Sequence, residues 1–271
     1  SYDANGNPTN GIGAPSANPN TVTGARSYAW DGADRLVQIT YGSGTSNSTS
    51  LSYDGFGRLV QVVETVNGVT QSDELFVWIG NTMVEQRNAQ GAEVKAYFGQ
   101  GFLDGTAAYY YGEDHLGTVR NLTDSTGTIQ SLLDYGPYGE LTGINGQTQP
   151  DFAYTGMFSH QRSGLYFAEY RAYDGGLKRW LNRDPLVSDE EDVAELAVGS
   201  NLYDYVGNNP LALTDPSGED PVQPGGTTGG FTPFRKIYPP KRGANKAPAP
   251  QKGKSCYPKG NTTRRTGKQA Q

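Results

Sequence analysis

Few side chains of this 271-residue chain have the types and spacing that enzymatic chemistry requires. The two histidines, His115 and His160, do not stand at metal-ligand spacings, and the single cysteine, Cys256, is near neither in sequence. The glycine pairs match no phosphate-binding loop, and no Ser/His/Asp pattern is recognisable along the chain. The sequence therefore predicts no metal and no cofactor, and it leaves the 28 acidic side chains as candidates for catalysis.

A pair of carboxylates held close together could catalyse hydrolysis without any cofactor. Two such groups cannot both ionise cheaply, so they share one proton. The ionised member can activate a water molecule while the protonated member donates its proton to the leaving amide. Which carboxylates meet depends on the elements that position them.

The composition favours short β-strands as those elements. Glycine (37 residues) supplies tight turns, and tyrosine (18) outnumbers tryptophan (3) and phenylalanine (9), which suits strands with one face in water. The stretch WDGADRLVQ at 30–38 recurs as YDGFGRLVQ at 53–61, and YDANGN at 2–7 is a degenerate copy. Each copy predicts an aromatic residue that ends a strand, an Asp-Gly turn, and a β-branched strand that returns.

The return strands should each have one buried face. Alternation predicts that the buried residues are Val37, Ile39, Tyr41, Val60 and Val62. The dipeptide Asn67-Gly68 predicts a further hairpin turn, whereas the Gly-, Asn- and Ser-rich segments 10–25 and 42–50 are typical of loops.

A series of ordered motifs resembles the Rhs/YD-repeat family and its C-terminal repeat-associated core module, whose relatives include Rhs polymorphic toxins and Tc toxin C components. The motifs are YGEDHLGTVRNLTD at 111–124, DYGPYGE at 134–140, YTG at 154–156, SGLYF at 163–167, YRAYD at 170–174, RDP at 183–185, NLYDYVGNNP at 201–210 and DPSG at 215–218. The resemblance covers about residues 26–218. It implies a mainly β fold, in which YD-repeat hairpins stack into a spiralling shell and the core module plugs one end.

The resemblance and the composition together predict three parts: YD-repeat hairpins over 1–70, the core module over 71–218, and a variable tail over 219–271. Residues 1–218 carry 11 Lys and Arg against 26 Asp and Glu, whereas the tail carries 11 against 2. The tail is rich in Pro, Gly and Lys and has little apolar content. It should therefore be disordered, and a folded toxin is not expected there.

The resemblance also implies a single aspartyl self-cleavage just after the DPSG motif. The residues that match the family's catalytic positions are Asp184 of RDP and Asp204 of NLYDY. Arg183 would orient this pair or balance its charge. The bond to be cut would be Glu219–Asp220.

Two departures from the family pattern leave a non-catalytic role open. Glu219 stands where relatives have an apolar residue, and a charge is costly in an apolar pocket. A helix expected over 188–198, opened by the capping box SDEE, replaces a short turn and adds five carboxylates. In the alternative interpretation, Asp184 caps a turn and Asp204 is a surface residue of a strand.

The leading functional hypothesis is structural. We expect a fragment of a secreted or surface-exposed bacterial protein that encloses or presents its own C-terminal segment, with preceding repeats of the parent chain and the tail as partners. The alternative is a module that binds carbohydrate or another cell-surface ligand. The basic tail lacks the paired acidic or His residues of a nuclease, so nucleic acid is not the expected partner. No run of about 18 apolar residues predicts a membrane span.

Overall fold

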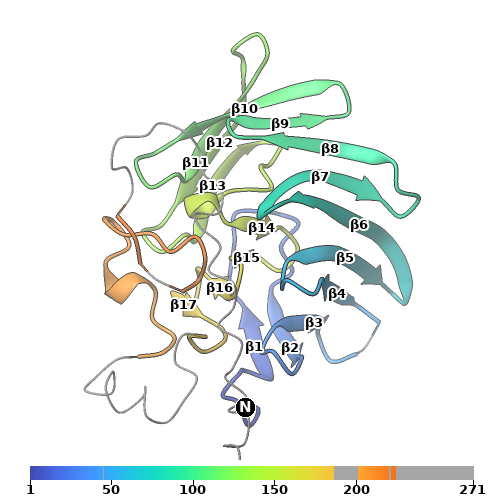
Figure 1. Cartoon of the computed structure of the whole chain (residues 1–271), viewed down its shortest axis with the longest axis vertical. Coiled ribbons are helices and arrows are strands. Elements are labelled where there is room, and N and C mark those ends of the chain that lie inside the picture. The colour runs from blue at the N-terminus through green and yellow to red at the C-terminus, as the bar shows by residue number, and fades with distance from the viewer. Residues whose placement is uncertain (45, 186–200, 220, 224–271) are drawn as a thin grey trace, which may run out of the picture. The chain divides into compact units, whose positions relative to one another are not determined.

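Two antiparallel sheets make up the described part of this chain (Figure 1). The computed structural model describes residues 1–44, 46–185, 201–219 and 221–223, which all belong to one structural unit, Ser1–Arg235. The helix expected over 188–198 and nearly all of the tail expected to be disordered lie outside the described residues. Within them, the prediction of a mainly β fold is confirmed.

The large sheet is a thirteen-stranded meander in which every strand pairs with its neighbours in chain order. Its strands are β1 (Asn10–Gly13), β2 (Gly24–Trp30), β3 (Leu36–Tyr41), β4 (Ser48–Tyr53), β5 (Leu59–Val66), β6 (Val69–Ile79), β7 (Thr82–Asn88), β8 (Glu93–Phe98), β9 (Gly101–Asp104), β10 (Ala107–Glu113), β11 (Val119–Asp124), β12 (Ile129–Tyr135) and β13 (Leu141–Gly146). The small sheet contains β14 (Phe158–His160), β15 (Leu165–Phe167), β16 (Ala172–Asp174) and β17 (Arg179–Trp180), also in chain order. Two short 3-10 turns, η1 (Tyr154–Gly156) and η2 (Val206–Asn208), flank the small sheet in sequence.

One turn design recurs between the strands of the large sheet. At the second repeat, one oxygen of Asp54 accepts the backbone N–H groups of Phe56 and Arg58 at 2.9 and 3.0 Å, and the other binds the Arg58 guanidinium at 2.6 Å. The fourth residue of this turn, Gly57, has a φ of +87°, which glycine adopts without strain. The same two N–H groups are capped in four other turns between strands, by Asp31, Asn88, Asp114 and Asp124, and in a turn that precedes β1, by Asp3. The Asp of the repeat therefore makes the turn, but the residue with positive φ is not the glycine directly after it.

A β-bulge follows the turn in both repeats and changes which residues are buried. In β3 the pairing with β2 shifts by one residue, so Val37 is extra and only half-buried. Leu36 and Ile39, three residues apart, face the core at 1% and 0% exposure. The second repeat is the same, with Leu59 and Val62 buried and Val60 half-buried. The predicted alternation is confirmed for Ile39, Tyr41 and Val62 and is wrong for Val37 and Val60.

The hairpin turn predicted at Asn67-Gly68 is confirmed, because both residues have positive φ and they join β5 to β6. The loop predicted over 10–25 is wrong at its ends, which form β1 and the start of β2. The loop predicted over 42–50 is likewise too long, since β4 begins at Ser48. The large sheet continues through residue 70 to Gly146, and the division of the chain at 70 and 218 stays a prediction.

The large sheet bends so that strands β2–β7 face the small sheet (Figure 1), and the two share one apolar core. Its buried residues are Tyr28, Leu36, Ile39, Tyr41, Leu51, Leu59, Val62, Phe76, Met83, Phe152, Phe158, Leu165, Phe167, Ala172 and Leu181. Burial of so many large apolar side chains, each contributing about 1.5–3 kcal/mol, supplies the main stabilisation between the sheets.

A second core is aromatic and lies on the face of the small sheet opposite the first core. It surrounds Tyr173 and Trp180, both at 0% exposure. Three consecutive carbonyls of the turn between β12 and β13, at 137–139, accept the hydroxyl hydrogens of Tyr154, Tyr173 and Tyr166 at 2.8–2.9 Å. Buried tyrosine hydroxyls require such partners. These bonds fix the end of the large sheet onto the small sheet.

Candidate functional site

Arg171, which directly precedes β16, organises the region that contains the predicted carboxylates. Its guanidinium binds Asp184 (Nη1 to Oδ2, 3.1 Å) and Asp215 (Nη2 to Oδ2, 3.0 Å). It also lies over the ring of Trp180, 4.5 Å from the centroid. Arg171 is 4% exposed and Asp215 is 1% exposed, so the pairing takes place away from water, where an unpaired charge would be costly.

Asp215 connects this guanidinium to the chain segment that precedes the predicted cleavage site. Its Oδ1 accepts the backbone N–H groups of Gly218 and Glu219 at 2.8 and 3.0 Å. Burial raises the pKa of the Asp215 carboxyl, while Arg171 and these N–H groups act in the opposite direction. Arg171 completes the ring by donating its Nε–H to the carbonyl of Gly218. We call Arg171, Asp184, Asp215 and Gly218 the Arg171 clamp.

Asp184 and Asp204 lie on segments that run beside each other but have different side-chain partners. The backbone N–H of Asp184 donates to the carbonyl of Leu202 at 3.1 Å, two residues before Asp204. Asp204 itself is half-buried, and its Oδ2 accepts a long hydrogen bond of 3.5 Å from Asn208. The assignment of these two residues as a catalytic pair stays a prediction.

The role predicted for Arg183 stays a prediction. Its side chain is beside Gly6 and Tyr203, where its charge partly offsets the effect of burial, which raises the pKa of the Tyr203 hydroxyl. The guanidinium of Arg171 binds Asp184. Glu219 is half-buried with its N–H held by the clamp, and Asp220 lies outside the described residues.

The clamp was not predicted from the sequence, although both of its motifs are present there. Arg171 stands in the motif YRAYD and Asp215 in DPSG, and in the sequence both motifs indicate only the family resemblance. Their contact joins residues 44 apart, which no local spacing predicts.

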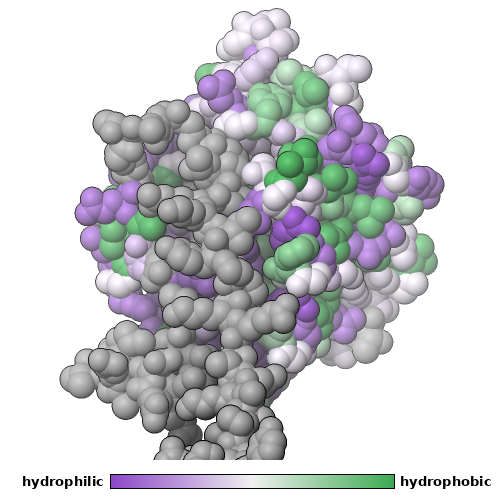
Figure 2. Space-filling view, viewed as in Figure 1, coloured by the Kyte–Doolittle hydropathy of each residue, from purple (hydrophilic) through white to green (hydrophobic). Residues whose placement is uncertain are grey.

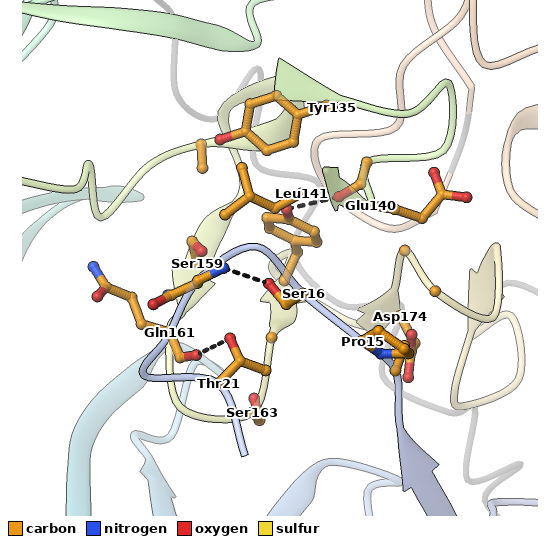
Figure 3. Close-up of a pocket in the computed structure, with 18 of the residues that line it drawn as sticks. Pro15, Ser16, Thr21, Tyr135, Glu140, Leu141, Ser159, Gln161, Ser163 and Asp174 are labelled. Atoms are coloured by element: carbon orange, nitrogen blue, oxygen red, sulfur yellow. Dashed lines mark hydrogen bonds between the residues drawn. The ribbon is translucent and has the colours of Figure 1, made fainter. Parts of the chain in front are cut away.

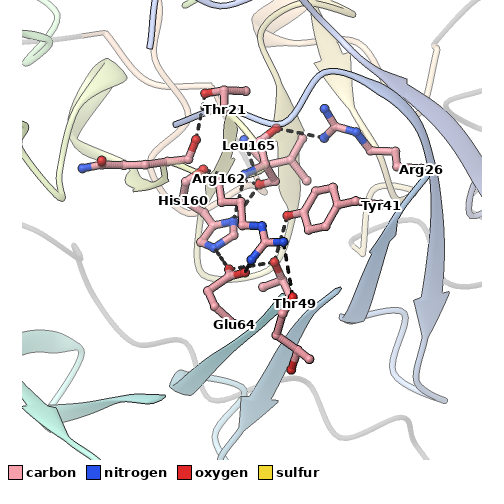
Figure 4. A network of polar contacts seen from close by, with 11 residues as sticks. Thr21, Arg26, Tyr41, Thr49, Glu64, His160, Arg162 and Leu165 are labelled. Atoms are coloured by element: carbon pink, nitrogen blue, oxygen red, sulfur yellow. Dashed lines mark hydrogen bonds and ion pairs between the residues drawn. The ribbon is translucent and has the colours of Figure 1, made fainter. Parts of the chain in front are cut away.

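A second polar cluster joins β5 to the turn between β14 and β15 (Figure 4). Glu64 accepts three hydrogen bonds of 2.7 Å, from His160 Nε2, Arg162 Nη1 and Thr49 Oγ1. His160 contacts Ser163 through its other ring nitrogen at 2.8 Å. This cluster ties the large sheet to the small one by partly buried polar groups, and sequence reasoning missed it.

The two histidines belong to no metal centre within the described residues. His115 is exposed, and its Nε2 contacts the carbonyl of Leu211, 96 residues later in the sequence, at 3.1 Å. Within the described ranges, no three His, Cys, Asp or Glu side chains are grouped as a metal site would need. No helix in that part of the chain is long and apolar enough to cross a membrane.

This chain is similar to known proteins in its fold and in one of its repeats. The family model "RHS Repeat" matches residues 30–70. The chain is 23% identical over 225 residues to double-stranded DNA deaminase toxin A of Burkholderia cenocepacia, and 26% identical over 264 residues to toxin protein Tse5 of Pseudomonas aeruginosa. It is 36% identical over 103 residues to toxin subunit YenC2 of Yersinia entomophaga.

These matches cover 70%, 80% and 36% of this chain but only 15%, 18% and 10% of those relatives, so the chain spans a small part of their length. A crystal structure of TcdB2-TccC3 has the same fold over 73% of this chain and 11% of its own, with a TM-score of 0.56 and 23% identity. The likeness to solved structures therefore concerns the fold.

Proposed function

We propose that this chain, which carries an RHS repeat and is related to Rhs and Tc toxin proteins, is part of a β-shell that encloses or presents its own C-terminal segment. The observation that supports this best is the pairing of all thirteen strands in chain order. Such a sheet leaves β1 at one edge, and Ile12 on it is 70% exposed. An exposed edge strand is a template for another strand, here a preceding hairpin of the parent protein. Export to the cell surface or medium is part of this proposal.

We further propose that the chain cuts itself once near Glu219–Asp220. The Arg171 clamp supports this, because one guanidinium holds Asp184, Asp215 and the Gly218 carbonyl one residue before Glu219. A fixed scissile segment is what proximity catalysis requires. In the proposed reaction, Asp184 and Asp204 share a proton; one carboxylate activates water and the other protonates the leaving amine.

The intact mass of the expressed chain tests this reaction. Self-cleavage yields two products, with a new N-terminus at Asp220, and Asp184→Asn or Asp204→Asn abolishes it. Asp104→Asn, which changes an exposed carboxylate at the end of β9, should cleave like the unmodified chain. A folded chain that keeps its full mass after prolonged incubation would exclude the reaction.

A binding module remains the second candidate because two aromatic rings are exposed side by side. Phe98 on β8 and Tyr110 on β10 are 38% and 39% exposed, with ring centroids 5.9 Å apart. On the described part of the face in Figure 2, hydrophobic and hydrophilic residues are interspersed over the strands. Signals on a glycan array that disappear in Phe98→Ala would support this function, and a blank array would count against it.

A further inference from the structure

Ser163, His160 and Glu64 form a hydrogen-bonded line that the proposed function does not use. Figure 4 shows how His160 and Glu64 face each other. Ser163 Oγ lies 2.8 Å from His160 Nδ1, and His160 Nε2 lies 2.7 Å from Glu64 Oε1. Ser163 and His160 are 2% and 7% exposed. A hydroxyl next to an imidazole that a carboxylate orients is the arrangement that activates a serine as a nucleophile.

The hydrogen bonds determine which way the proton can move along this line. The backbone N–H of Ser163 donates to His160 Nδ1 at 3.4 Å, so this nitrogen is an acceptor and the ring hydrogen is on Nε2, facing Glu64. Ser163 Oγ accepts the backbone N–H of Leu165 at 3.1 Å. Its own hydrogen has two acceptors, the carbonyl of His160 at 3.4 Å and His160 Nδ1 at 2.8 Å, and Nδ1 is the nearer. Arg162 and Thr49 hold Glu64 in place, each at 2.7 Å.

Ser163 also lines a cavity of about 40 Å³ (Figure 3). The other lining residues include polar ones such as Thr21 and Gln161 and apolar ones such as Leu133 and Leu141, so the wall is mixed. A cavity of this volume has room for on the order of three water molecules, which is the size of an acetyl group. The geometry therefore restricts any acyl substrate to a short one.

A buried cation faces the same cavity. Arg26 is 3% exposed and donates from Nη1 to the Ser163 carbonyl at 2.8 Å. Within the described residues it has no carboxylate partner within 4.0 Å, and its Nε has no hydrogen-bond acceptor. A guanidinium with a free donor in a water-poor site can stabilise an oxyanion that forms nearby.

We propose that Ser163 is a nucleophile toward short acyl esters, with His160 as base, Glu64 as the positioning carboxylate and Arg26 as the cation for the oxyanion. The Ser163 Oγ forms a bond to the acyl carbon while its proton passes to His160 Nδ1. The C–O bond to the alcohol then breaks, and His160 returns the proton to the leaving oxygen. Water releases the acyl group by the same steps in reverse order.

The test is acetylation of the full chain by 4-nitrophenyl acetate, followed by intact mass and peptide mapping. Ser163 should carry an acetyl group, or nitrophenolate should be released catalytically. Ser163→Ala should abolish both, and His160→Gln should slow them at least about 100-fold, as loss of a general base does. Ser52→Ala is the control, because this serine is exposed on β4 and lies outside both the cavity and the line.

Tryptophan fluorescence should show that every variant is folded before its rate is compared. Should His160→Gln fail to fold, the comparison of Ser163→Ala with Ser52→Ala decides alone. Absence of an acetyl group and of nitrophenolate release in the folded unmodified chain would overturn the proposal. Equal rates in Ser163→Ala and the unmodified chain would do the same, since lysine acetylation would then explain the signal.

Discussion

Removing the Arg171 guanidinium should strongly destabilise the fold, because it would leave Asp215 as a buried, unpaired charge. Arg171→Met keeps most of the stem but loses the contacts to Asp215 at 3.0 Å and Asp184 at 3.1 Å. Breaking a buried pair by removing one partner costs about 3–5 kcal/mol. The free energy of unfolding of a whole domain is about 5–15 kcal/mol, so this loss should markedly lower the urea concentration at the unfolding midpoint.

The double variant tests the reasoning behind that magnitude. Asp215→Asn keeps an oxygen for the N–H groups of Gly218 and Glu219 but removes the charge. The loss of stability in Arg171→Met with Asp215→Asn should therefore be smaller than the sum of the losses in the two single variants, by about 0.5–3 kcal/mol of coupling. Urea unfolding followed by the fluorescence of the fully buried Trp180 measures all three variants. A double variant as unstable as the sum of the single changes would refute the argument.

Three further perturbations address the turns and a buried carboxylate. Asp54→Ala should lower the free energy of unfolding by about 2 kcal/mol in urea titrations, because a charged cap is lost, whereas Asp124→Ala, in an exposed turn without an arginine, should cost less. Gly68→Ala should cost about 1–2 kcal/mol through its φ of +77° alone, since nothing lies within 4 Å of an added methyl group; unchanged stability would disprove that strain. Burial raises the pKa of the Asp174 carboxyl above its usual 3.8, so the ionised form disfavours folding and stability falls as the pH rises through that raised pKa. Asp174→Asn should lack this part of the pH dependence of unfolding, and an identical pH profile would contradict the assignment.

The turns of the large sheet could be read from the sequence because their chemistry is local. An Asp that caps its own turn and a glycine three residues later act within five residues. The bulges could not be read, because they depend on the register between two strands. The glycines of β1 predicted a loop, but at Gly11 glycine is required by packing. A Cβ at Gly11 would come within 2.7 Å of the Tyr28 ring.

The candidate sites show the same division between local and distant information. The motif around Asp184 was found in sequence, but its guanidinium partner Arg171 was not, because that contact depends on how the small sheet folds. The line from Ser163 to Glu64 was not recognisable, since His160 and Glu64 are 96 residues apart. Sequence motifs identified the segments, and tertiary packing determined their partners.

Pairing of the strands in chain order has a consequence for how this protein is made and how it can change in length. Each hairpin can complete its backbone bonding as soon as the next one emerges from the ribosome, because closing a short loop costs little entropy. A genetic duplication or loss of one whole hairpin would leave the register of all other strands intact. The contact between Glu64 and His160 is different, because it must wait until the small sheet has been synthesised. We therefore expect assembly to run in one direction, with the long-range polar contacts forming last.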